Sequence, residues 1–145
     1  MLMSGFGPLN GVRVIDAGTV IAAPYGASLL ADFGADVIKI EMPGSGDPVR
    51  GLTPHVDGVS VRWTALNRNK RCITLDLRSE DGKDVFLKLI EKSDILIENF
   101  RPGTLDRWGL DYETLKSINP GIIVVRISGY GQTGPNSQMA GFGTP

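Results

Sequence analysis

Short runs of β-branched and other apolar residues alternate along the chain with longer segments whose apolar residues recur at helical spacing. The short runs predict strands at 12–17, 35–41, 71–77, 94–98 and 121–127. The longer segments predict helices at 25–33, from Ser79 onward, at 104–109 and at 111–118. Strands that alternate with helices form right-handed β-α-β units, so their strands run parallel in one sheet. We therefore expect an α/β fold, a parallel sheet with helices on both faces.

The segment after Ser79 has the features of a helix with one buried face. Ser79 is a typical N-cap, and two acids follow it in the first turn, where the helix dipole favours negative charge. The apolar side chains of this segment form one stripe: Val85, Phe86, Leu89 and Ile90. Residues 42–66 are rich in Gly and Pro instead, and we expect them to form the main irregular connection.

Composition narrows the class of protein. The 145 residues correspond to one domain, and 15 basic against 16 acidic residues create no overall field for nucleic acid or an anionic membrane. The single cysteine, Cys72, excludes an internal disulfide, and its place in a predicted strand suggests a core position. We see no signal peptide, no membrane-spanning run and no metal-ligand spacing, so we expect a soluble cytoplasmic protein without a bound metal.

The segment "GYGQTGP" (129–135) contains G-x-G-x-x-G, a pattern of dinucleotide-binding loops. Such a loop normally follows the first strand and opens a helix, whereas this one follows the fifth strand and leads into Pro135, Asn136 and Ser137. Glu41, at the end of the second strand, is the one feature that favours a nucleotide cofactor. We interpret 129–135 as a Gly-rich turn with positive φ angles.

Two basic groups are candidates for binding an anion. The first consists of Arg62, Arg68, Lys70 and Arg71, with Arg78 just beyond, and it suits either a polyphosphate or a solvated face. The second is "ENFRPGTLDRWG" (98–109), which follows the fourth strand.

In this second group an amide, an aromatic ring and two guanidiniums suit an adenine nucleotide with phosphates: Asn99, Phe100, Arg101 and Arg107. The purely structural alternative makes Phe100 a core residue and Arg107 an ordinary surface residue. Asp16 is equally open between a site carboxylate and a turn-former, and we expect His55 to lie on the surface.

Several of these segments together resemble a known family. They are "PLNGVRVIDAGTVIAAP", "LLADFGADVIKIEMPGSGDPVR", "LNRNKRCITLDLRSEDGK" and "DILIENFRPGTLDRWGLDYETLKSINPGIIVVRISGYGQTGP". In order and spacing they resemble the N-terminal part of the family III coenzyme A transferases (the CaiB/BaiF family), which include formyl-CoA transferase and carnitine CoA-transferase. The resemblance runs from about Pro8 to Pro135, nearly the whole chain.

The resemblance implies that residues 1–145 are the N-terminal, Rossmann-like part of a CoA-binding large domain, in a protein that forms an interlocked homodimer. It implies transfer of CoA between an acyl-CoA and a small carboxylic acid through an aspartyl anhydride and an aspartyl-CoA thioester. Acyl-CoA is then a substrate, and no cofactor is tightly bound. The family's CoA contacts carry over to Leu75, Arg78, Asn99, Phe100, Arg101 and Arg107.

The resemblance also leaves questions open. The family's nucleophilic aspartate lies downstream of the segment that matches 129–135, beyond Pro145, so we expect this chain alone to be inactive. Ile21, Met42 and Ser128 differ from formyl-CoA transferase, which leaves the donor and acceptor acids open.

Two alternatives from other classes are a racemase and a binding module. An α-methylacyl-CoA racemase would carry Gly-His-Asp where this chain has "AGFG" (140–143), with Phe142 and Gly143 in place of His and Asp. The second alternative is a nucleotide-binding module without catalysis.

Overall fold

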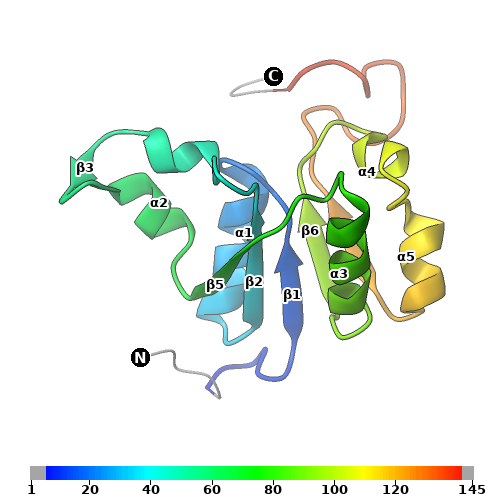
Figure 1. Cartoon of the computed structure of the whole chain (residues 1–145), viewed down its shortest axis with the longest axis horizontal. Coiled ribbons are helices and arrows are strands. Elements are labelled where there is room, and N and C mark those ends of the chain that lie inside the picture. Colours follow the sequence, from blue (N-terminus) through cyan, green and yellow to red (C-terminus); the bar gives the residue numbers. More distant parts are fainter. Residues whose placement is uncertain (1–5, 142–145) are drawn as a thin grey trace.

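A computed structural model describes residues 6–141, and its centre is a five-stranded parallel sheet (Figure 1). The order across the sheet is β5-β2-β1-β6-β7. The strands are β1 (Arg13–Asp16), β2 (Asp36–Glu41), β5 (Lys70–Thr74), β6 (Ile95–Glu98) and β7 (Ile123–Arg126). All four neighbouring pairs are parallel, so the predicted α/β fold is confirmed.

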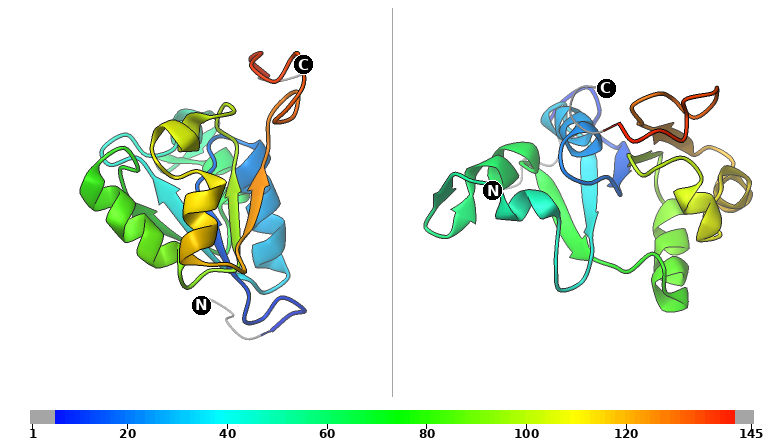
Figure 2. Two further views of the ribbon diagram at one scale, coloured as in Figure 1. Left: turned by 90° about the vertical axis from the view of Figure 1, so that its right-hand side faces the viewer. Right: turned by 90° about the horizontal axis from the view of Figure 1, so that it is seen from above.

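Helices cover both faces of this sheet (Figure 2). On one face lies α1 (Ala22–Asp32), and on the other lie α3 (Glu80–Ile90) and α5 (Tyr112–Ile118), with the short α4 (Thr104–Arg107) between β6 and α5. Buried alanines of α1 pack against Val14, Val37 and Ile97, and their small size lets the helix approach the sheet closely. Among residues 6–141, no helix is both long and apolar enough to cross a membrane.

Helix α3 forms as its sequence predicts, with one difference. The Ser79 hydroxyl caps it by accepting a hydrogen bond from the Gly82 amide at 3.1 Å. A Cβ atom at Gly82 would lie 1.9 Å from the Asp76 carbonyl oxygen, so only glycine permits this approach. Phe86 and Ile90 are buried, but Val85 is 44% exposed because it points about a quarter turn away from Phe86.

The connection from β2 to β5 is not wholly irregular. It contains a 3₁₀ helix η1 (Pro48–Gly51), a hairpin of β3 (His55–Val56) and β4 (Val59–Ser60), and the helix α2 (Val61–Leu66). We call residues 48–66 the arm, since they project beyond the edge strand β5 (Figure 1). His55 is exposed there, as predicted.

The base of the arm is tied to the sheet by one arginine. Arg50 pairs with Glu41 through two hydrogen bonds, of 2.7 and 2.8 Å. The same guanidinium lies 3.5 Å from the ring centroid of Trp63 in α2, a cation–π contact. Burial raises the pKa of Glu41, but the hydrogen bonds from Arg50 and from the Asp47 amide outweigh burial and hold that pKa below its usual value.

The prediction that Cys72 lies in the core is wrong, because the side chain is exposed. Cys72 belongs to β5, which forms an edge of the sheet and has a neighbour on one side only. Side chains alternate along a strand, so Ile73 turns into the core while Cys72 turns to the opposite face.

One part of the sheet carries exposed apolar side chains. In β7, Val124 packs into the core beside α5, while Ile123 is 58% exposed and Val125 38% exposed on the other face. Helix α1 lies over the neighbouring strands on that face, and Leu29 of this helix and Phe33 directly after it are also exposed. Parallel sheets usually have both faces covered, so this region is an apolar surface with no covering element among the described residues.

We expect purified residues 1–145 to associate through the exposed face of β7. Ile123→Lys with Val125→Lys should lower the sedimentation coefficient toward that of a monomer, since a lysine resists burial against an apolar partner. Val85→Lys is the matched control, because Val85 is similarly exposed on α3, away from this face, and should leave association unchanged. A monomeric wild-type chain over a wide concentration series in sedimentation velocity would contradict this expectation.

Candidate functional site

From β1 the chain first adds β2 and β5 on one side of the sheet, and then returns to add β6 and β7 on the other side. The strand order therefore reverses between β1 and β6. Open α/β sheets bind ligands at this switch point, beyond the carboxyl ends of the strands. A pocket of about 80 Å³ lies at this edge. The residues that line it follow four different strands, and they include Thr19, Met42, Leu75, Arg78, Phe100 and Trp108.

The pocket combines an apolar wall with a charged rim. Phe100 and Trp108 meet edge to face, with ring centroids 5.3 Å apart, and Leu75 packs against the same core. Arg78 lies at the rim, where its exposed guanidinium bonds the Asp76 carboxylate at 2.9 and 3.0 Å. These features suit a flat, largely apolar group inside the pocket and an anionic group outside it.

Three of the six predicted CoA contacts line this pocket, namely Leu75, Arg78 and Phe100. Asn99 has a different place, because its side-chain amide accepts from the Thr19 amide at 2.7 Å and donates to the Thr19 carbonyl at 2.9 Å. Asn99 therefore holds one wall of the pocket instead of lining it. Its contact with CoA stays a prediction.

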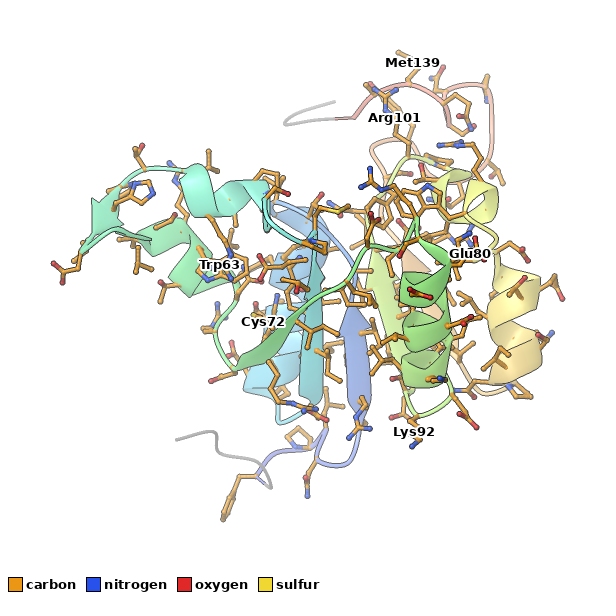
Figure 3. The ribbon with its side chains drawn as sticks, in the orientation of Figure 1. Trp63, Cys72, Glu80, Lys92, Arg101 and Met139 are labelled. Carbon is orange, nitrogen blue, oxygen red and sulfur yellow. The ribbon has the colours of Figure 1, made fainter. Side chains whose placement is uncertain are left out.

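Arg101 and Arg107 are exposed and do not line the pocket. Arg101 lies at the edge of the sheet where α4 begins (Figure 3). Arg107 belongs to α4, and its guanidinium bonds the Thr104 hydroxyl at 2.9 Å. Among the described residues this hydroxyl is a neutral partner, and no carboxylate pairs with Arg107; the neighbouring Asp106 pairs with Arg126 instead. The charge of Arg107 is therefore available to an anion.

The basic run between Arg62 and Arg71 does not form a common anion site. Arg71 pairs with Asp36, Arg68 pairs with Asp32, and Arg62 donates to the Thr53 carbonyl. The side chain of Lys70 is wholly buried against Asp16. Arg62 lies in α2 and Arg68 in the turn before β5, while Lys70 and Arg71 are successive residues of β5 and point to opposite faces, so closeness in sequence did not bring these charges together. Only Arg78, beyond the run, reaches the pocket.

A cluster of buried charges adjoins the pocket, and the sequence did not reveal it. It consists of Asp16, Lys39, Asp47 and Lys70, whose side chains are at most 1% exposed. Asp16 pairs with Lys70 and also accepts a hydrogen bond from the Gly18 amide at 3.0 Å, a contact that fits the turn-forming interpretation of this residue. Burial lowers the pKa of Lys70 below its usual value despite the neighbouring Asp16.

One signal could have revealed the cluster. Lys39 interrupts the apolar strand "DVIKIE", and a lysine inside a sheet that is covered on both faces requires a buried counter-charge.

Glu98, at the end of β6, supports the other side of the site. It is 4% exposed, accepts a hydrogen bond from the Phe100 amide at 2.6 Å and lies 3.8 Å from the Arg126 guanidinium. Burial raises the pKa of Glu98 above its usual value, since these two contacts do not compensate for the lost water. Glu98 fixes the start of the segment that carries Phe100 and α4.

The "GYGQTGP" segment is a turn, as predicted, and not a dinucleotide loop. Gly131 and Gly134 have φ angles of 81° and 92°, and no helix follows among the described residues. A Cβ atom on Gly129 would lie 2.6 Å from the Cα of Gly141, so two glycines permit the close approach of these backbone segments. Within residues 6–141, no group of His, Cys, Asp or Glu side chains is arranged to hold a metal ion.

The family model described as CoA-transferase family III matches residues 9–144. The chain belongs to this family. It is 52% identical, over 93% of its length, to the alpha subunit of succinyl-CoA–L-malate CoA-transferase from Chloroflexus aurantiacus. It is 44% identical, over 95% of its length, to the acetyl-CoA:oxalate CoA-transferase of Acetobacter aceti. The aligned regions are 32% and 36% of these two relatives, so the chain spans about a third of their length.

A solved structure agrees with this assignment. A CaiB/BaiF family protein from Brucella suis superposes with a TM-score of 0.88 at 43% identity, covering 94% of this chain and 37% of that one. The resemblance drawn from the sequence motifs is thereby confirmed, together with the α/β architecture. The two racemase-specific positions, Phe142 and Gly143, lie outside the described residues.

The raised pKa of Glu98 predicts a stability change with pH. A carboxyl group with a higher pKa in the folded state binds its proton more tightly there, so folding loses stability as pH rises from the usual value of 4.5 through the folded pKa. Glu98→Gln keeps an acceptor for the Phe100 amide and removes this titration. The variant should therefore gain thermal stability relative to wild type at pH 7 and not at pH 4, as measured by calorimetry. A stability difference that is the same at both pH values would contradict the expectation.

Proposed function

We propose that this chain is the N-terminal, CoA-binding part of an acyl-CoA:carboxylate CoA-transferase. The observation that carries the proposal is the pocket at the switch point, which is lined by Leu75, Arg78 and Phe100 in a chain of this family. The names of the relatives support the same reaction class, since these names describe CoA transfer with acids such as succinate, malate and oxalate.

CoA would be held in two parts. The pocket of about 80 Å³ is much smaller than the roughly 300–1,000 Å³ that a whole drug-sized ligand fills, so it would take only one part of the molecule. Leu75 and Phe100 suit the flat adenine, while Arg78, Arg101 and Arg107 would surround the phosphates from outside. This binding needs no tightly bound cofactor, since acyl-CoA is itself a substrate.

The chemistry would be covalent catalysis by a carboxylate outside residues 1–145. The carboxylate attacks the thioester carbonyl and the C–S bond breaks, so CoA leaves as a thiolate and a mixed acyl-aspartyl anhydride forms. The thiolate then attacks the aspartyl carbonyl, which releases the donor acid and forms an aspartyl-CoA thioester. A small carboxylic acid collects CoA by the same two steps in reverse. The role of the described residues is to bind and orient the CoA portion.

An interlocked homodimer in the cytoplasm completes the proposal. The arm supports it, because it projects from the sheet and carries apolar side chains that are 39%, 61% and 51% exposed, namely Leu52, Val56 and Val59. Apolar residues on a projecting segment suit burial against a second chain.

The whole reaction can be tested with a protein that contains this chain and its downstream sequence. Acyl-CoA donors incubated with a panel of small carboxylic acids should yield the corresponding new CoA thioesters by mass spectrometry. Hydroxylamine should trap one modified aspartate downstream of Pro145. Residues 1–145 alone should show no turnover. Proton exchange at the acyl α-carbon without CoA transfer would identify a racemase instead, and CoA binding without either reaction would identify a binding module.

Arg107→Ala should raise the KM for acyl-CoA roughly tenfold to a hundredfold, because a charge-assisted hydrogen bond is worth about 1.5–3 kcal/mol. The kcat at saturating acyl-CoA should fall much less, since the contact is the same in the ground and transition states. Arg107→Lys should recover part of the loss, because it keeps the charge and loses the planar fork. The matched control is Arg71→Ala, an exposed arginine at the opposite edge of the sheet. An unchanged KM in Arg107→Ala would make Arg107 a surface residue.

A further inference from the structure

We propose that the buried charge cluster positions the loop after β1 against the pocket, with Lys39 and Asp47 as its positioning residues for CoA binding. The cluster is Asp16, Lys39, Asp47 and Lys70, and we call residues 18–20 the β1 loop. The inference rests on the proposed function for its ligand, whereas the positioning itself follows from contacts within the described residues.

Lys39 joins parts of the chain that are far apart in sequence. Its ammonium lies 3.1 Å from Oδ2 of Asp47 and 3.9 Å from Oδ1 of Asp16, and it donates to the Gly18 carbonyl. Asp47 stands directly before the arm, so one ammonium connects the end of β1, the β1 loop and the base of the arm.

Lys70 neutralises the second carboxylate. Its ammonium lies 2.7 Å from Oδ2 of Asp16 and donates to the Pro24 carbonyl and to Oδ1 of Asn67 at 2.7 and 2.9 Å. The cluster thus contains two cations and two anions, all desolvated, and each has polar partners.

The β1 loop is held by side chains at almost every backbone polar group. The Gly18 amide donates to Asp16 at 3.0 Å, and the Val20 amide donates to both oxygens of Asp47 at 3.2 Å. Between them, the amide and the carbonyl of Thr19 are both bound by Asn99. This conformation is not one that the chain adopts readily by itself, because Val20, a β-branched residue, has a φ of 63°.

Stability alone does not explain so many buried charges. A buried ion pair is often no more stabilising than well-packed apolar residues of the same volume, because desolvation cancels most of the attraction. Strained backbone persists where the surroundings over-determine it, and it gathers at ligand sites. Here the strained loop and its anchors share the pocket wall, since Ala17, Thr19 and Asp47 all line it. A fixed wall lowers the ordering cost of binding, so the cluster acts on affinity.

Two double variants test this in the protein with its downstream sequence. Lys39→Met/Asp47→Leu removes the ion pair and the acceptor for the Val20 amide, while Lys39→Met/Asp47→Asn removes the ion pair and keeps that acceptor. We expect the first to raise the Kd for CoA by about tenfold or more, and the second to recover part of that loss. Each double variant removes one positive and one negative charge, and the remaining Asp16 still pairs with Lys70.

Asp36→Asn is the matched control. Asp36 belongs to the same strand as Lys39 and pairs with Arg13 and Arg71 at the opposite edge of the sheet. It should lower the melting temperature without changing the Kd for CoA. An equal rise in Kd for this control would overturn the proposal, because the effect would then follow global stability.

Hydrogen exchange supplies a readout that does not require the proposed function. The amides of Thr19 and Val20 should lose protection in Lys39→Met/Asp47→Leu, while that of Ile15 in β1 keeps it. Unchanged protection of the loop would overturn the positioning role. A wild-type protein that does not bind CoA would refute the proposed function and leave this readout intact. If the double variants do not fold, the single variant Asp47→Asn is compared with wild type instead. Hydrogen exchange of the β1 loop and a Kd for CoA that both equal the wild-type values in Asp47→Asn would overturn the proposal.

Discussion

All five strands of the main sheet run parallel, so their carboxyl ends lie on one side of that sheet, and the rest of the structure depends on this constraint. Every crossover must return to the opposite edge before the next strand begins, which places α1 on one face and α3 and α5 on the other. The loops that follow β1, β2, β5 and β6 therefore converge, and Thr19 after β1 meets Asn99 after β6 although 80 residues separate them along the chain. The pocket is the space that these loops leave.

The same constraint concentrates polar groups where the sheet ends. Asp16, Glu41 and Glu98 each occupy the last position of a strand, and all three are at most 6% exposed. The partners that compensate for burial differ among the three carboxylates. Asp16 faces lysines, Glu41 faces Arg50, and Glu98 accepts an amide while its pKa rises. The three carboxylates organise the loops around the pocket, and we assign none of them to the chemistry of acyl transfer.

Membership in CoA-transferase family III gives this arrangement its context. The described residues supply a largely apolar pocket with the Arg78 guanidinium at its rim. A chain that spans about a third of its relatives has surfaces that meet nothing within residues 6–141. The exposed face of β7 and the projecting arm are two such surfaces, and both carry exposed apolar side chains.

The sequence by itself determined the local elements. Alternation of short apolar runs with helical periods predicted the five strands to within two or three residues at each end, and Ser79 predicted a helix start, because these signals arise from neighbours in the chain. The motif "ENFRPG" also identified the edge of the sheet at which the pocket lies.

Only the tertiary structure decided which charges are buried and which are free. Lys39, Lys70 and Arg71 look alike in sequence, yet the first two are enclosed and the third is half exposed. Cys72 turned outward because β5 is an edge strand, and Asn99 turned to Thr19, 80 residues away. The physical reason is the same in each case. A residue's burial and partners depend on strand order and on contacts between distant segments, which no local pattern specifies.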